Sequence, residues 1–345
     1  MKSSKSILLF VFLFLLLAGT SSYAQDVHFS EFSLTPLQQN PAMAGIDQGL
    51  EASINYKDQW RSVSSPYKTL DVSADGRLNK RRIRNAFLAA GLSVVNDKAG
   101  DGNMGTFQVD VSFAGHVLLD AHNTLGGGIM AGFGQRSVNY SNLQWASQFD
   151  GNGFNSALPG GEAGASSGYS FMDLGAGIAW AYHASSQNIA GFDHSNVTAG
   201  LAIFHPQQPM YGFDHGSAKL DPRIVAHINA RIDLKNKDLA IVPAAMYYKQ
   251  GVMQELLIGA ALRFSLRKES HSNGYTSGSA FSIGLHYRSD DAVIATMLLE
   301  LGQMGFGFAY DINVSQLQTA SSSRGGLELS IYFHRAASPR YKAHE

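Results

Sequence analysis

The sequence predicts an all-β protein, a single antiparallel transmembrane β-barrel of about 14 strands preceded by a plug segment. Three observations support this: apolar and polar residues alternate with period two through most of the chain, the alternating segments are long, and the N-terminus resembles an export signal. Strands of soluble sheets usually run to about 5 or 6 residues. Several segments here, such as 223–235 and 255–267, run to about 10 to 14, which suits strands tilted across a bilayer.

The first 24 residues have the form of a signal peptide. Lys2 and Lys5 precede an unbroken apolar run over 7–18, and small residues at Ser22 and Ala24 occupy the positions that signal peptidase reads. The run is shorter than the roughly 20 residues of a membrane-spanning helix, so a retained anchor is the weaker alternative. We therefore expect cleavage near Ala24 and an exported mature chain that begins at Gln25.

Composition narrows the class of protein. Charged residues make up 15% of the chain, against roughly 25% in an average soluble domain. The absence of cysteine excludes disulfides, thiolate metal sites and a lipid-attached N-terminus. The mature chain has 24 basic and 27 acidic residues, which gives no reason to expect nucleic acid as a partner. No linker-like break divides the chain, so we expect one large β body.

Residues 25–47 form an irregular stretch that we expect to lie in or beneath the barrel lumen as a plug. Pro41 pushes the residue before it out of the helical region, and Gly45 frees the backbone to turn. The candidate plug residues are Asn40, Pro41, Ala42 and Gly45.

The barrel itself is expected over 48–335, followed by a tail over 336–345. Alternation is clearest over 107–113, 223–235, 255–267 and 327–334. Weaker patterns predict strands over 50–56, 67–74, 86–95, 125–136, 169–183, 196–205, 239–249, 279–288, 293–301 and 304–314. The total of about fourteen is even, as single-chain bacterial barrels require.

The lengths of the connections predict the orientation of the barrel. The two longest, 139–168 and 206–221, follow the fifth and seventh predicted strands. If the first strand runs outward, both lie outside the cell, where outer-membrane barrels carry their long loops. Two connections on the opposite side, 185–193 and 268–278, are longer than typical periplasmic turns.

Motifs that could support catalysis or metal binding are weak in this sequence. Residues 164–168 fit the G-x-S-x-G pattern, but no helical pattern follows, and that motif requires a sharp strand-to-helix turn. Residues 150–153 resemble only a fragment of a calcium loop, so a tight turn is the better interpretation. We predict no enzyme, no cofactor and no metal site; an outer-membrane enzyme is the weakest alternative.

The long connection over 139–168 contains the best candidate for a partner-binding loop. Its candidate residues are Trp145, Phe149, Asp150 and Phe154. Exposed aromatic residues often anchor protein interfaces. The alternative is that this loop packs onto the barrel mouth.

Several blocks of residues together resemble the PorP/SprF family of type IX secretion system membrane proteins. The blocks are Gln25–Ser30, Asn40–Gly45, Gln59 with Trp60, Pro66–Thr69, Gln148–Asp150, His205 with Pro209, Tyr310–Ser315 and Gly325–Ser330. The last two are the most specific. The tail from Arg335 onward departs from the pattern, since many barrels stop at an aromatic residue such as Phe333.

The resemblance implies a Bacteroidota outer-membrane barrel similar to the long-chain fatty-acid transporter fold, tied to type IX secretion and, in some members, to gliding motility. It implies outer-membrane lipid around the barrel and, as partners, periplasmic secretion-ring components or the C-terminal domain of a secreted cell-surface protein such as an adhesin. The hatch-like N-terminal stretch leaves an alternative, a channel for the uptake of hydrophobic small molecules.

The C-terminal family motif comprises Tyr310, Asp311, Asn313 and Ser315. Because side chains on a strand alternate between faces, Asp311 and Asn313 share one face and Tyr310 lies on the other. We predict that the polar pair points inward, towards the plug that holds Asn40.

Overall fold

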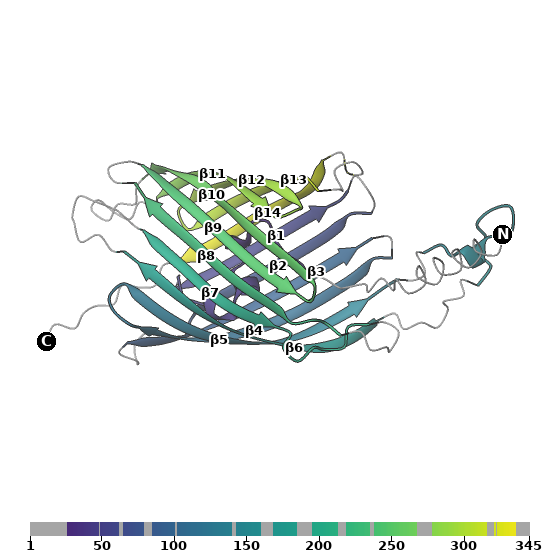
Figure 1. The fold of residues 1–345 in the computed structure, drawn as a ribbon, viewed down its shortest axis with the longest axis horizontal. Helices are drawn as coiled ribbons and strands as arrows, with labels where there is room; N and C mark the ends of the chain where they lie inside the picture. Colours follow the sequence, from purple (N-terminus) through teal and green to yellow (C-terminus); the bar gives the residue numbers. More distant parts are fainter. Residues whose placement is uncertain are drawn as a thin grey trace, which may run out of the picture.

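The chain forms a closed barrel of fourteen antiparallel strands over its described residues (Figure 1). The strands are β1 (Leu50–Gln59), β2 (Tyr67–Arg77), β3 (Ala86–Ala99), β4 (Met104–Leu118), β5 (Asn123–Ser137), β6 (Gly168–His183), β7 (Asn196–Phe204), β8 (Arg223–Asp233), β9 (Leu239–Gln250), β10 (Met253–Arg267), β11 (Ser279–Arg288), β12 (Ala292–Leu301), β13 (Met304–Asn313) and β14 (Arg324–Arg335). Each strand pairs with its neighbours in sequence, and β14 pairs with β1. The predicted fold class and strand number are confirmed.

This computed structural model describes residues 26–47, 49–61, 65–78, 85–100, 102–139, 143–159, 168–184, 195–212, 219–234, 238–267, 278–315, 321 and 323–335. The predicted signal peptide, the tail over 336–345 and most of the G-x-S-x-G stretch lie outside these residues. No helix among the described residues is both long and apolar enough to cross a membrane.

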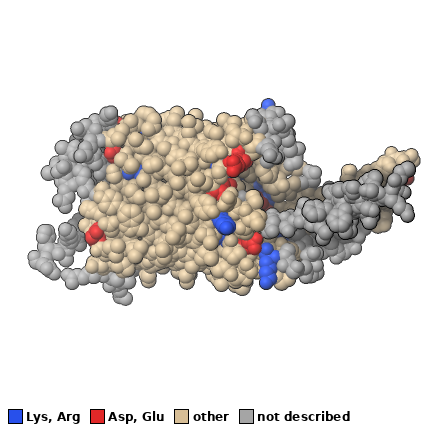
Figure 2. Space-filling model, viewed as in Figure 1, with Lys and Arg blue, Asp and Glu red and all other residues tan. Residues whose placement is uncertain are grey.

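Side chains alternate between a lipid-facing outer surface and a polar lumen. On β2, Leu70 and Val72 are 37% and 40% exposed, whereas Asp71 and Ser73 between and beside them are buried. Figure 2 shows the consequence on the visible face, where charged side chains lie towards the two ends and the band between them is uncharged. This distribution suits a barrel that meets hydrocarbon in its middle and headgroups at its rims.

Strand bounds differ from the predicted ones where alternation is weak. The fourth strand, expected over 107–113, extends over Met104–Leu118 because backbone pairing with β3 and β5 continues through glycines that carry no apolar signal. His205 was expected to end the seventh strand, but its φ of 57° is left-handed, and β7 ends one residue earlier.

The barrel has two distinct ends. We call the end with the connections after β1, β3, β5, β7, β9, β11 and β13 the odd end, and the opposite end, where β1 begins and β14 ends, the even end. The two longest connections between strands, 138–167 and 205–222, both lie at the odd end. By the length rule for outer-membrane barrels, the odd end is expected to face outward.

Residues 26–47, here called the N-terminal segment, lie inside the ring of strands. They contain three short turns, η1 (Phe32–Leu34), α2 (Pro36–Gln39) and η2 (Pro41–Met43). The Asp26 backbone N–H donates to Gln250 at the odd end, and the Gly49 backbone N–H donates to Arg335 at the even end. The segment therefore crosses the lumen from the odd end to the even end before β1 begins, as the purple ribbon in Figure 1 shows.

Candidate functional site

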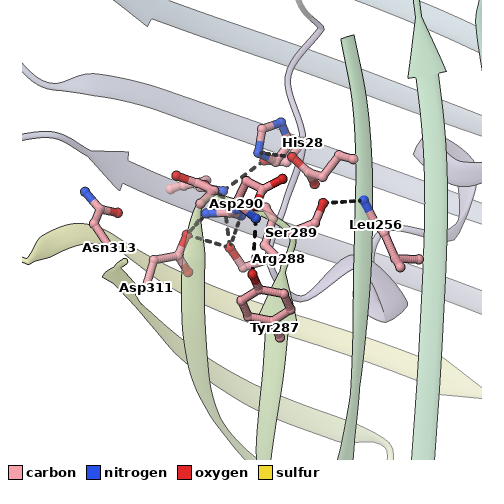
Figure 3. Close-up of polar contacts among 12 residues, drawn as sticks. His28, Leu256, Tyr287, Arg288, Ser289, Asp290, Asp311 and Asn313 are labelled. Carbon is pink, nitrogen blue, oxygen red and sulfur yellow. Dashed lines mark hydrogen bonds and ion pairs between the residues drawn. The ribbon is translucent and has the colours of Figure 1, made fainter. Parts of the chain in front are cut away.

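A buried ion-pair cluster lies where the C-terminal family motif meets the lumen. It consists of Lys57 on β1, Arg288 on β11, Asp311 on β13 and Glu328 on β14, and each of these side chains is at most 2% exposed. The Lys57 ammonium lies 2.8 Å from Glu328 and 4.0 Å from Asp311. The Arg288 guanidinium lies 2.5 Å from Asp311 (Figure 3). Two cations and two carboxylates thus neutralise one another away from water.

Strand register explains how these four side chains meet. Lys57 and Glu328 are direct cross-strand partners on the seam between β1 and β14. Arg288 must reach across β12 to Asp311, and the residue of β12 opposite it is the small Ala292. A bulge between Tyr310 and Ile312 shifts the pairing of β13 with β14 next to Asp311. Such bulges re-aim side chains within a sheet.

The cluster binds the N-terminal segment directly. The Glu328 carboxylate accepts hydrogen bonds from the backbone N–H groups of Ser30, at 2.6 Å, and Glu31, at 3.1 Å. The Ser30 hydroxyl donates to Asp311 at 2.9 Å, and Lys57 donates to the carbonyl oxygen of His28 at 3.0 Å. Two blocks at opposite ends of the sequence therefore form one buried site.

Two titratable groups of the segment lie beside this cluster. Burial and the nearby Glu328 carboxylate raise the pKa of Glu31 well above its usual range. Burial, with the charges of Lys57 and Arg288, lowers the pKa of His28 well below its usual value. Neutral His28 lies 3.2 Å from the Tyr248 hydroxyl.

A second buried cluster holds the start of the segment at the odd end. His205 lies between two carboxylates, with Nε2 2.6 Å from Asp26 and Nδ1 2.7 Å from Asp173. Arg223 lies 3.4 Å from Asp26 as well. Burial alone would lower the pKa of His205, but the carboxylates of Asp26 and Asp173 raise it to about 9. His205 is therefore a cation at neutral pH and completes a charge-balanced contact.

Asn40 ties the middle of the segment to the far wall of the lumen. It is fully buried, and its side-chain amide donates to the carbonyl oxygen of Ile178 at 2.9 Å and accepts from the Ala42 backbone N–H at 2.9 Å. This approach requires glycine on two strands, because a Cβ at Gly177 or Gly200 would overlap the Asn40 amide.

Hydrogen bonds to β2 hold the end of the segment. The Gly45 backbone N–H donates to Asp75 at 2.6 Å, and Arg77 donates to the carbonyl oxygens of Gly45 and Ile46 at 2.8 and 2.9 Å. Gly45 itself has a φ of 64°, a conformation that suits glycine. Pro41 and Ala42 are buried against β5, where a Cβ at Gly128 would lie 2.5 Å from the Ala42 nitrogen.

The other residues of the C-terminal motif have smaller roles in the site. Asp311 is 1% exposed and reaches the N-terminal segment through Ser30, not through Asn40. Asn313 is buried and donates to the Ser321 hydroxyl at 3.1 Å. Tyr310 is half-buried, and the Ser315 backbone N–H donates to the carbonyl oxygen of Asp291 at 3.2 Å.

The candidate partner-binding loop lies apart from the lumen. Phe149 and Phe154 are 62% and 49% exposed and pair as an isolated β-bridge, while Trp145 is half-buried. Asp150 accepts from the backbone N–H groups of Asn152 and Gly153 at 3.0 and 3.1 Å, which closes a tight turn between the two phenylalanines. Figure 1 shows this teal hairpin beyond the odd end of the barrel.

Sequence reasoning found part of this site. It placed Asp311, Glu328, Asp26 and His205 within the family-like blocks, but it did not single out Lys57, Arg288 or Asp173. A charged residue on the inward face of a predicted transmembrane strand was the available signal, since such residues are costly unless they are paired. No group of three or more ligating side chains suitable for a metal occurs among the described residues.

Comparison with known proteins places this geometry in a family. Residues 21–333 match the sequence pattern of the type IX secretion system membrane protein PorP/SprF. The chain belongs to the PorP/SprF family. The match spans nearly the whole chain and confirms the resemblance carried by the sequence blocks. PorP/SprF membership identifies the protein as a type IX secretion barrel of the outer membrane and gives no indication of an enzyme. Among curated proteins, no sequence matches this one.

Solved structures share the barrel architecture of this PorP/SprF protein at very low sequence identity. The monoaromatic hydrocarbon channel CymD is 10% identical, with 92% of this chain and 96% of that chain covered and a TM-score of 0.46. A mutant of the monoaromatic hydrocarbon channel TodX is 9% identical, with the same coverage and TM-score. The β domain of the Bordetella autotransporter BrkA is 11% identical, with 83% and 99% covered and a TM-score of 0.39.

Proposed function

We propose that this barrel is a plugged docking protein of the type IX secretion machinery. In this role it binds the C-terminal domain of a secreted cell-surface protein, such as an adhesin, or periplasmic ring components, and helps to export the secreted protein or to hold it at the surface. Family membership supports the secretion role. The observation that supports the docking role is the N-terminal segment, which lies inside the ring and forms polar contacts with strands around it.

Residues 25–47 are the plug in this proposal. Support comes from contacts in three directions: Asn40 bonds to β6, Gly45 to β2, and Ser30 to β13. Two buried ion pairs hold the segment: the pair of His205 and Asp26 at its start, and the pair of Lys57 and Glu328 near Ser30. An uptake channel for hydrophobic molecules would instead need a continuous apolar path, and charged groups line this lumen.

The hairpin with Phe149 and Phe154 is the proposed contact for the secreted protein. Aromatic side chains give large contact areas at low entropic cost, and they dominate the energetics of many interfaces. The turn closed by Asp150 holds the two rings in place before a partner arrives, which reduces the cost of ordering them on binding. Outward projection from the odd end makes the rings accessible to a protein at the cell surface.

Co-purification from native membranes tests the proposal. Affinity-tagged wild-type protein is expected to retain a secreted protein, ring components or both. Phe149→Ser combined with Phe154→Ser is expected to lose the secreted protein while the barrel still folds. Met210→Ser is the matched control, because Met210 is 59% exposed at the same end. Recovery of no secreted protein and no secretion component with the wild type would count against docking.

A further inference from the structure

Among the residues that the structure describes, the outer surface of the barrel carries an excess of positive charge at the odd end of β1, β2 and β3. Lys68 on β2 and Lys98 on β3 are exposed, and each lies one residue from the odd end of its strand. Both belong to the lipid-facing set of alternating residues, in line with Leu70 on β2 and Leu92 on β3. Arg61, in the connection after β1, is 75% exposed at its side chain.

The two lysines are direct cross-strand partners in the ladder between β2 and β3. Directly opposed side chains in an antiparallel pair have Cβ atoms about 4.5 to 5.5 Å apart, and like charges in that position are destabilising. Among the described residues, neither lysine forms an ion pair with a carboxylate. Two lysine cations therefore face each other on the membrane-facing surface, and neither has an anionic partner among these residues.

The one carboxylate in the same outward row does not supply that charge. Asp58 on β1 is the register partner of Lys68. However, Asp58 is 8% exposed, and it binds the Arg61 guanidinium at 2.6 Å and the Tyr56 hydroxyl at 3.5 Å. Arg61 thus balances Asp58, and both lysine charges remain in excess.

One neighbouring aromatic residue, Trp60 in the connection after β1, lies at the rim beside the patch, whereas Tyr67 has the lumen-facing parity of Thr69. Trp60 and Tyr67 pack edge to face at 4.8 Å at the same rim. Trp60 has a left-handed φ of 56°, and its backbone N–H donates to the carbonyl oxygen of Gly325 at 3.0 Å. Tryptophan concentrates at headgroup level, and lysine extends its charge to that level along an apolar stem.

We propose that Lys68, Lys98 and the adjacent Arg61 bind the phosphate of an anionic lipid headgroup in the leaflet at the odd end. By the orientation of the long loops, this is the outer leaflet, so the ligand is a phosphorylated glycolipid. One phosphate placed between the two ammonium groups would relieve their repulsion, and the guanidinium has unused N–H donors for a second phosphate oxygen. The site does not depend on any secretion partner.

The test uses the purified barrel in nanodiscs that contain either a bisphosphorylated glucosamine glycolipid or its dephosphorylated form. Retention of lipid through detergent exchange is measured by native mass spectrometry. Wild-type protein is expected to retain the phosphorylated form selectively. Lys68→Gln combined with Lys98→Gln is expected to lower that retention by roughly thirtyfold, since each lysine near an anionic surface contributes a few-fold in affinity.

Lys249→Gln is the matched control. Lys249 is also exposed, also faces lipid and lies one residue from the odd end of β9, but its register partners are Ile224 and Gln254, so no second cation opposes it. Unchanged retention in the double variant, an equal loss in the control, or saturation of the site by inorganic phosphate alone would each overturn the lipid assignment. The double variant removes a repulsion and is expected to unfold no more readily than the wild type, which urea titration of both proteins checks.

Discussion

Removing the Lys57 ammonium is the most direct test of how the N-terminal segment is held inside the barrel. This group contacts the Glu328 carboxylate at 2.8 Å, the carbonyl oxygen of His28 at 3.0 Å and the Ser30 hydroxyl at 3.3 Å, and its side chain is 1% exposed. Lys57→Met keeps most of the volume and deletes the charge. Glu328 then becomes a buried carboxylate without a cation beside it.

The expected loss of stability follows from the contacts that remain. Deleting one partner of a buried ion pair costs about 3 to 5 kcal/mol. Glu328 keeps two backbone N–H donors from the segment, and Asp311 keeps Arg288, so the loss should lie at the lower end. A loss of about 3 kcal/mol corresponds to a folding equilibrium roughly a hundredfold less favourable.

Two assays report on this variant. Urea titration of the barrel in liposomes gives the free energy of unfolding. Because the chain contains no cysteine, Thr35→Cys introduces a unique buried thiol in the segment, whose maleimide labelling should accelerate when Lys57 is replaced. Adding Glu328→Gln to Lys57→Met should recover part of the loss, and Lys249→Met should change stability by under about 0.5 kcal/mol. A loss below about 1 kcal/mol with unchanged labelling would refute the reasoning.

Three further outcomes are expected. In the folded protein the pKa of His205 is about 9, above its ordinary value of 6.5. Its contribution to the stability of the folded state is therefore full below about pH 6.5 and disappears as the pH rises through 9. Proteolysis of the segment should increase over that pH range, and His205→Gln should abolish the increase. Gly177→Ala should displace the segment and lower the urea midpoint, whereas Gly127→Ala, whose Cβ would meet only the Gly177 carbonyl oxygen at 4.0 Å, should not; equal midpoints would contradict the close approach. Phe149→Ser with Phe154→Ser should leave the urea midpoint unchanged while partner recovery falls, and a lowered midpoint would mean that the rings pack onto the barrel.

Periodicity predicted the barrel well because each transmembrane strand carries its own signal. A strand such as β8 alternates isoleucine or alanine with charged and polar residues, so the pattern alone indicates a two-faced surface. Strand ends were less predictable. β4 runs past its clear pattern on both sides, since backbone pairing with its neighbours does not require large apolar side chains.

Periodicity could not predict which side chains contact one another inside the lumen. Alternation showed that Asp311 and Asn313 share a face, but their contacts depend on which strands close the ring and on what fills it. Arg288 reaches Asp311 across an intervening strand, and Ser30 reaches it from a segment without regular structure. Such contacts arise from a register of many strands, which no single stretch of sequence encodes.

The seam between β1 and β14 links closure of the barrel to the N-terminal segment. Lys57 and Glu328 face each other across this last seam, and both also bind the N-terminal segment. The residues that pair across the closing seam are therefore also the residues that bind the N-terminal segment. Without the segment, the barrel would close on a charge pair lacking its backbone donors and its Ser30 hydroxyl, so a ring without the segment is expected to be the less stable one.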